Sequence, residues 1–232
     1  SSIFALTKFI KMRTYNFFLF FFIVLLIHAC IKDESEGYNG NKLPYGDKTR
    51  TKIEGVVLEY GTRKPLANVM VFLDESHSAP FSGGGTYYPI DTTFTDAEGK
   101  FVYDFKHIPN SDKLKWDYQV RTQPYLYYPD YKSLESGYQY KNNELIVEPY
   151  SFIRAHIKNV NSFDDEDYIF VFAGGDGDGF KGKNLDLFEI FKTGGNQKIR
   201  IFYRVHKNQM ISEKSDSIYI KGHDTINVEI LY

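Results

Sequence analysis

The segment KPLANVMVFL, residues 64–73 of the 232-residue chain, carries the clearest fold signal in the sequence. Pro65 fixes its backbone φ angle at a turn, so a new element can begin just after it. Beyond the turn, apolar side chains alternate, with Val69, Val71 and Leu73 on one face. A period of two is typical of a β-strand with one face in a core. The segment therefore predicts a turn followed by a half-buried strand.

A second segment, TDAEGKF at residues 95–101, predicts a tight hairpin turn. Asp96 can cap the turn through its side chain, and Gly99 can adopt the positive φ that such turns require. Lys100 then begins the next strand, and Phe101 is placed to enter the core. A first strand containing a glycine, IEGVV at residues 53–57, precedes both segments.

Together these three segments resemble the carboxypeptidase regulatory-like family, over Lys52 to Glu148. The resemblance implies a transthyretin-like β-sandwich that serves as an accessory domain. It implies the fold of this segment and does not imply an activity. The sequence departs from the family pattern by a long insertion, Asp74 to Tyr88, which includes the glycines of SGGG at residues 82–85. Pro89 lies in the strand that follows, which indicates an edge position because proline cannot donate a ladder hydrogen bond.

Short strands separated by turns continue to the end of the chain, and no stretch of ten or more residues keeps a clear helical period. Alternating apolar residues predict strands over 100–105, 116–123, 199–205 and 226–230. Pro149 is expected to interrupt pairing, and Phe152 to open a new strand. The predicted fold is all-β, with two tandem β-sandwich domains at residues 52–149 and 150–232. The second is expected to be immunoglobulin-like or transthyretin-like, without resemblance to a specific family.

The N-terminal region has the pattern of a secretory signal peptide at residues 1–29. FFLFFFIVLLI, residues 17–27, is too short for a spanning helix but fits the apolar region of a signal peptide, and Lys8, Lys11 and Arg13 supply the positive charge before it. Met12 is the expected start of translation, and residues 1–11 are interpreted as upstream read-through.

The apolar run ends in Ile27-His28-Ala29-Cys30, which resembles a bacterial lipobox. That resemblance implies cleavage after Ala29 and lipidation of Cys30, the only cysteine in the chain. Two or more acyl chains would anchor the protein stably, whereas one would not. The alternatives are a plain secreted protein with an incidental cysteine, or an uncleaved membrane anchor.

Residues 32–36, KDESE, resemble the surface-export signal of Bacteroidota lipoproteins, and the alternative is a solvated charge run. Residues 30–51 are interpreted as the lipidated cysteine and a flexible tether. The expected location is the outer membrane, lipid-anchored and facing the cell surface. Without residues 1–29 the chain has 25 basic and 30 acidic residues. Its net charge of −5 disfavours docking on anionic lipid, so attachment depends on the acyl chains.

The composition excludes several classes of protein. With 28 Lys and Arg against 30 Asp and Glu, and a pI of about 6.3, the chain lacks the basic surface of a nucleic-acid binder. A single cysteine excludes a disulfide framework. The sequence contains no G-x-S-x-G or H-E-x-x-H motif, and no histidine pair has metal-ligand spacing. We therefore predict that the protein is not an enzyme and needs no cofactor.

Two acidic stretches form a weak calcium candidate, because calcium prefers carboxylate and carbonyl oxygens. The alternative is a pair of solvated β-turns in which glycine supplies positive φ. The candidate ligands are Asp164, Asp165, Asp167, Asp176 and Asp178.

A tyrosine-rich region is the candidate ligand surface, because exposed aromatic rings bind sugars or proteins by stacking. The alternative is that these rings are half-buried sandwich and loop residues, since tyrosine is a good strand former. An exposed flat row is predicted from Trp116, Tyr125, Tyr127 and Tyr128.

Three functions therefore compete. The first is a binding or scaffold lipoprotein that works with other envelope proteins, and the second is a glycan-binding accessory in nutrient capture. The third is an enzyme, which predicts a pocket where two or more titratable side chains converge.

Overall fold

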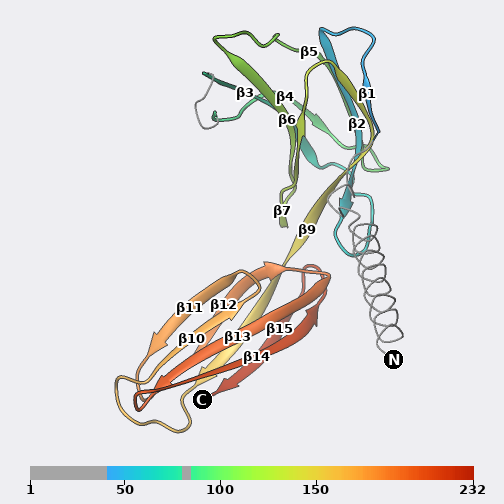
Figure 1. Cartoon of the computed structure of the whole chain (residues 1–232). Helices are drawn as coiled ribbons and strands as arrows, with labels where there is room; N and C mark the ends of the chain where they lie inside the picture. The colour runs from blue at the N-terminus through green and yellow to red at the C-terminus, as the bar shows by residue number, and fades with distance from the viewer. Residues whose placement is uncertain (1–40, 80–84) are drawn as a thin grey trace, which may run out of the picture. The chain divides into compact units, whose positions relative to one another are not determined.

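The computed structural model describes residues 41–79 and 85–232. All the regular structure in these two ranges consists of β-strands (Figure 1). Within them no helix is long and apolar enough to cross a membrane. The all-β class predicted from the sequence is confirmed.

Two sheets enclose the first hydrophobic core. One has the strand order β1-β9-β2-β5, and the other has the order β4-β3-β6-β8. The strands are β1 (Asn41–Pro44), β2 (Arg50–Glu59), β3 (Met70–Ser78), β4 (Tyr88–Phe94), β5 (Lys100–Lys106), β6 (Lys115–Gln123), β8 (Tyr131–Leu134) and β9 (Tyr138–Lys158).

Alternation along the strands builds this core as predicted. Val69, Val71 and Leu73 are buried, and so are Phe101 and Tyr103. Pairing with β3 alone places β4, which contains Pro89, at the edge of its sheet, as expected.

The predicted hairpin turn is also present. Asp96 Oδ1 accepts hydrogen bonds from the backbone N–H groups of Glu98 (3.0 Å) and Lys100 (2.8 Å), and Gly99 has a φ of +75°. A Cβ at Gly99 would lie only 3.0 Å from the Val57 carbonyl oxygen, so glycine satisfies both the angle and the space.

Strand β9 belongs to both halves of the protein. Its first part pairs with β1 and β2, and its last part pairs with β12 (Asp186–Gly194) and β15 (Thr225–Leu231). Between them, β7 (Tyr127–Tyr128) pairs with Glu148 and Pro149. The expected break at Pro149 and new strand at Phe152 are therefore wrong. The Pro149 carbonyl still accepts the Gly195 N–H at 2.7 Å, so the missing proline donor does not end the strand.

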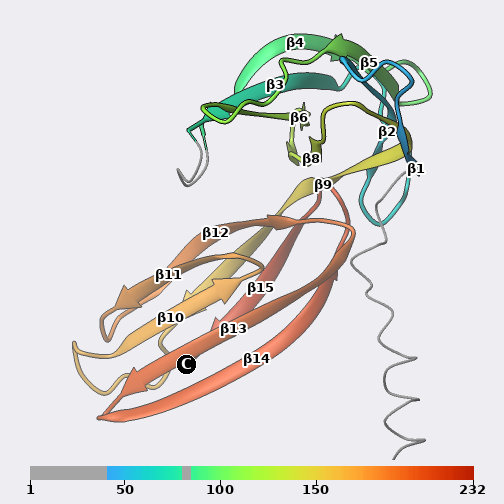
Figure 2. The same cartoon turned by 45° about the horizontal axis from the view of Figure 1, so that its top comes forward.

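A second core lies between the last part of β9, with β12 and β15, and a four-stranded sheet of order β11-β10-β13-β14 (Figure 2). The strands of that sheet are β10 (Tyr168–Ala173), β11 (Asp176–Lys181), β13 (Gln197–Lys207) and β14 (Met210–Ile220). The two cores fall within the ranges 52–149 and 150–232. The division into two separate domains stays a prediction.

Part of the predicted tether is folded, which corrects the interpretation of residues 30–51. Residues 41–44 form β1 and pair with residues 138–141 of β9, while β2 begins at Arg50. The Tyr45 hydroxyl donates to Asp104 Oδ2 at 3.0 Å. The four residues of β1, NKLP, are too few to show alternation, and their strand partner β9 lies far along the chain.

The predicted insertion, Asp74 to Tyr88, is shorter than expected, because β3 extends through Ser78. Asp74 of β3 links this polar part of the strand to β6. Its side chain is buried and accepts hydrogen bonds from Gln119 and Arg121 of β6. Residues 82–84 lie outside the described residues.

The N-terminal predictions also fall outside the described part of the chain. They concern the signal peptide at 1–29, Cys30 and the acidic residues 32–36. They stay predictions.

Candidate functional site

A cleft of about 450 Å³ lies beside the middle of β9. Its walls come from β7, β9, β12, the start of β13 and the β10–β11 connection. The lining residues are Tyr128, Glu148, Gly174, Gly175, Asp176, Lys192, Gly194 and Gln197. The backbone pairing on β9 explains this convergence, since Tyr128 pairs with Glu148 and Gly194 pairs with Tyr150.

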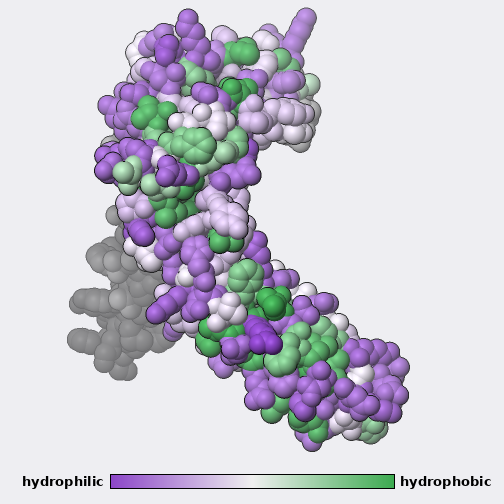
Figure 3. All heavy atoms as spheres, turned by 180° about the vertical axis from the view of Figure 1, so that it is seen from behind, coloured by the Kyte–Doolittle hydropathy of each residue, from purple (hydrophilic) through white to green (hydrophobic). Residues whose placement is uncertain are grey.

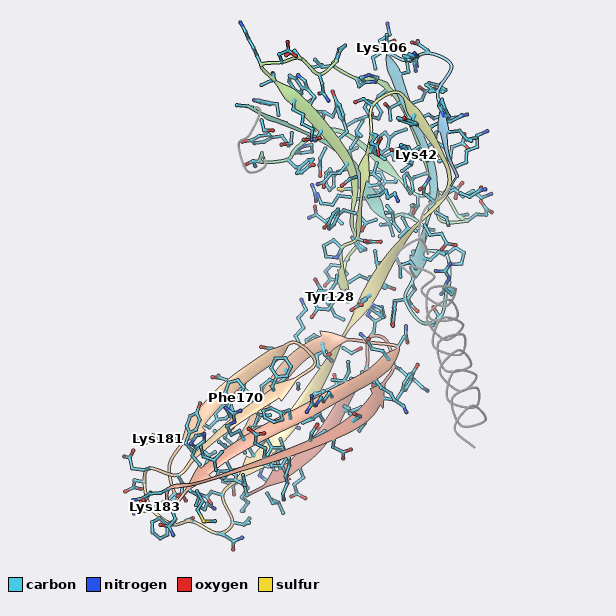
Figure 4. The ribbon with its side chains drawn as sticks, viewed as in Figure 1. Lys42, Lys106, Tyr128, Phe170, Lys181 and Lys183 are labelled. Atoms are coloured by element: carbon cyan, nitrogen blue, oxygen red, sulfur yellow. The ribbon has the colours of Figure 1, made fainter. Side chains whose placement is uncertain are left out.

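Two lining residues of this cleft, Tyr128 and Lys192, pack against the ring of Tyr150. The rings of Tyr128 and Tyr150 meet edge to face, with centroids 4.6 Å apart and planes at 77°. Lys192 Nζ lies 3.2 Å from the Tyr150 centroid and 5.1 Å from that of Tyr128. The ring quadrupoles attract the cation and hold it at the cleft. Burial raises the pKa of the Tyr128 hydroxyl above its usual value of 10.0, so the hydroxyl is protonated and can donate a hydrogen bond at neutral pH. Figure 4 labels Tyr128 beside β9.

The loop at the end of β10 contributes two glycines, Gly174 and Gly175, to the lining of the cleft. Gly174 has a φ of +67°, and a Cβ there would lie 2.1 Å from Thr193 Oγ1. Only glycine lets the loop pass this close to β12. After the loop, Asp176 Oδ2 accepts the Lys192 backbone N–H at 3.1 Å, which ties β11 to β12.

The chemistry of the cleft is that of polar recognition. Glu148 and Asp176 offer carboxylate acceptors, Lys192 and Gln197 offer donors, and Tyr128 offers an aromatic surface with a hydroxyl. A few convergent polar groups around an aromatic wall are typical of sites for small polar ligands.

The structure does not arrange the four predicted aromatic residues as one exposed row. Trp116 is half-buried against the first core, and the centroid of its ring lies 5.0 Å from that of the His77 ring. It lies near the start of β6, whereas Tyr125 follows the end of that strand and is 86% exposed. Tyr127 packs on the first core and donates a hydrogen bond to Glu59 Oε2 at 2.9 Å. Among the four, only Tyr128 lines the cleft, and ligand contact by these residues stays a prediction.

The candidate calcium ligands are divided between two places. Asp164, Asp165 and Asp167 precede β10, whereas Asp176 and Asp178 lie in β11, after β10 has ended. Asp167 is buried and caps its turn, because it accepts hydrogen bonds from the Phe163 N–H and from Asn159. In the part of the chain that the structure describes, no three His, Cys, Asp or Glu side chains are grouped to hold a metal ion.

Sequence reasoning missed Glu148, Lys192 and Gln197 as members of the cleft. Each is an ordinary polar residue of a strand, and nothing in its local sequence distinguishes it. Asp176 was singled out for calcium and Tyr128 for stacking, but only the pairing on β9 brings the two into one site.

Comparisons with known proteins give no family assignment. No protein-family model and no curated protein matches the chain. Among solved structures, the Bacillus anthracis TIE protein aligns with 13% identity and a TM-score of 0.31 over 79% of this chain and 34% of its own. A streptococcal ancillary pilin gives 14% identity and a TM-score of 0.28 over 79% of this chain and 63% of its own.

The shaft pilin SpaA from Lactobacillus rhamnosus GG gives 8% identity and a TM-score of 0.31 over 79% of this chain and 96% of its own. The match thus spans about a third of the TIE protein and less than two thirds of the ancillary pilin. TM-scores this low assign neither family nor activity, and the β-sheet architecture rests on the sheets described above.

Proposed function

We propose that this chain is a non-enzymatic, lipid-anchored protein of the bacterial cell surface that acts as a binding or scaffold module. In this proposal, acyl chains on Cys30 hold the protein in an outer membrane of Bacteroidota type. The residues between Cys30 and β1 form the tether, and the strands beyond it present the binding surfaces. The carboxypeptidase regulatory-like assignment of residues 52–148 belongs to the same proposal.

The observation that best supports a scaffold role is the continuity of β9. One strand of 21 residues contributes to both cores, and every residue from Val147 to Tyr150 has a pairing partner. Backbone hydrogen bonds on both sides of residues 147–150 oppose bending of β9 at this point. A scaffold that holds its partners in fixed positions would need such a stiff connection.

Incorporation of labelled palmitate tests the anchor. We expect the native chain, expressed in a Bacteroidota host, to take up label and to fractionate with the outer membrane. The Cys30→Ala variant should take up none and appear in soluble fractions, and Ser35→Ala is the matched control. Equal labelling of the native and Cys30→Ala proteins would refute the lipid anchor.

Surface exposure has a separate test. Protease added to intact cells should degrade the native protein, whereas neutralising Asp33, Glu34 and Glu36 should protect it by leaving it on the periplasmic side. If both forms are degraded equally, the acidic run is not an export signal.

The alternative function, a glycan-binding accessory in nutrient capture, is favoured by the cleft at Tyr128. Binding of the full chain in detergent to a glycan array tests it. The variant Tyr128→Ala should lose the signal, while the control Tyr131→Ala, at a tyrosine that is 65% exposed on β8, should keep it. Loss in both variants, or in neither, would argue against the cleft as the binding site.

A further inference from the structure

Strand β10 presents a row of three aromatic side chains on the outside of the second half. Ile169, Val171 and Ala173 point into the second core and are fully buried. Residues two apart in a strand share a face, so the intervening aromatic residues point outward, about 6.7 Å apart. They are Tyr168, Phe170 and Phe172. Figure 4 labels Phe170 on this strand.

Glycines on the neighbouring strand let these rings lie across the sheet. Gly177 pairs with Phe172, and Gly179 pairs with Phe170. A Cβ at Gly177 would lie 3.0 Å from the Phe172 ring, and one at Gly179 would lie 2.1 Å from the Tyr168 hydroxyl. The rings thus occupy the space that side chains on β11 would fill. Phe172 is 39% exposed, whereas Tyr168 and Phe170 are half-buried.

The other side of the row is basic. On β13, Phe202 pairs with Phe172, and the guanidinium carbons of Arg200 and Arg204 lie 5.6 and 5.9 Å from the Phe202 centroid. Arg204 forms an ion pair with Glu213 of β14. Arg200 Nε donates to the neutral Ser215 hydroxyl at 2.7 Å, which leaves its positive charge without a carboxylate counter-charge among the hydrogen bonds and ion pairs of the described residues.

We propose that this outer face of β10 and β13 binds an anionic polysaccharide. The apolar faces of its sugar rings would stack on Tyr168, Phe170 and Phe172, while Arg200 would meet its carboxylate groups. Charge complementarity supports this ligand, because Arg200 on this face is bonded to a neutral hydroxyl and can attract an anionic group. The inference deepens the glycan-binding alternative above, and it names a surface separate from the cleft at Tyr128.

Calorimetric titration of the full chain in detergent tests the proposal, with oligogalacturonate as the anionic probe and cellohexaose as the neutral one. We expect oligogalacturonate to bind and cellohexaose to bind at least tenfold more weakly. Phe172→Ala should weaken oligogalacturonate binding about tenfold, which is the upper end of what one aromatic contact contributes. Arg200→Gln should weaken it and reduce the salt dependence of binding.

The matched control is Phe188→Ala, because Phe188 is an exposed aromatic residue on β12, in the opposite sheet. The Phe188→Ala variant should bind oligogalacturonate with the affinity of the native chain. Thermal melting should show that all variants are folded. If Phe172→Ala unfolds, Arg200→Gln still tests the proposal, because unchanged oligogalacturonate binding in that variant would contradict it. The absence of oligogalacturonate binding, equal binding of cellohexaose, or equal losses in Phe172→Ala and Phe188→Ala would overturn the proposal. None of these outcomes bears on lipidation of Cys30, which is measured separately.

Discussion

The Asn196 side chain donates hydrogen bonds from Nδ2 to Glu59 Oε1 at 3.1 Å and to the Tyr60 carbonyl oxygen at 2.9 Å. Asn196 lies in the turn between β12 and β13, whereas Glu59 ends β2, so one amide links elements of the two cores. Its Oδ1 also accepts the Gly222 N–H at 2.8 Å. Asn196 therefore makes hydrogen bonds with three groups: the Glu59 carboxylate, the Tyr60 carbonyl and the Gly222 N–H.

Replacing Asn196 by aspartate should destabilise the protein. The carboxylate keeps the size of the amide and tolerates the φ of +58°, but it cannot donate to Glu59 and places a second negative charge beside it. We expect a loss of about 1–3 kcal/mol in the free energy of unfolding, measured by urea denaturation. Asn208→Asp is the control, because Asn208 also sits in a strand turn at positive φ. Equal losses in the two variants would mean that the link to Glu59 contributes nothing.

Glu59 should make stability depend on pH in the acid range. Burial alone would raise its pKa, but hydrogen bonds from Thr62, Tyr127 and Asn196 together lower it below the usual value of 4.5. A carboxylate with a lowered folded-state pKa stabilises the fold above its unfolded pKa, and that contribution is lost as pH falls through the folded pKa. The difference in unfolding free energy between the native chain and Glu59→Gln should therefore shrink from about pH 7 to pH 3. A constant difference would contradict this account.

The buried carboxylate of Asp74 should be sensitive to loss of its partner. Asp74 is 1% exposed, and its Oδ2 accepts hydrogen bonds from Arg121 Nε at 2.9 Å and from Gln119 Nε2 at 3.0 Å. Arg121→Met would leave a buried negative charge without its cation, at a cost of about 3–5 kcal/mol. The control Arg50→Met breaks the more exposed pair with Asp104 and should cost about 0–1 kcal/mol. Chemical denaturation of both variants measures the contrast, and similar losses would contradict it.

Gly174 should tolerate no side chain. Gly174→Ala combines an unfavourable φ of +67° with a collision against Thr193 Oγ1, so we expect a loss of about 2 kcal/mol or more. Gly46→Ala is the control, since a Cβ at Gly46 meets nothing within 4 Å and should change stability by less than about 0.5 kcal/mol. Differential scanning calorimetry of both variants measures their melting temperatures and tests this difference. A melting temperature for Gly174→Ala equal to that of Gly46→Ala would show that the loop can shift.

Local sequence patterns predicted the strands because the side chains that alternate are also the ones that are buried. Val71 and Leu73 of β3 and Tyr103 of β5 show this relation, and Asp96 with Gly99 specified a turn through short-range hydrogen bonds. Burial of one face determines the register of such strands, so the pattern and the structure agree.

Features that depend on distant partners were not predictable from local patterns. Residues 41–44 form a strand only because β9 lies beside them, and Pro149 continues β9 because its carbonyl finds the Gly195 N–H. The cleft requires Tyr128, Asp176 and Lys192 to meet, and they come from three separate parts of the chain. Figure 3 shows apolar residues scattered among polar ones on the face seen from behind.

The uninterrupted pairing of β9 has a mechanical consequence. Val147 is the last residue paired to β2, Glu148 and Pro149 pair to β7, and Tyr150 is already paired to β12. Tension along the chain would therefore meet hydrogen-bonded ladders in shear, with no slack linker to extend first. Strand β9 therefore joins the two halves directly, and a pulling force would have to break the strand pairing of β9 in one of the cores before the halves could separate.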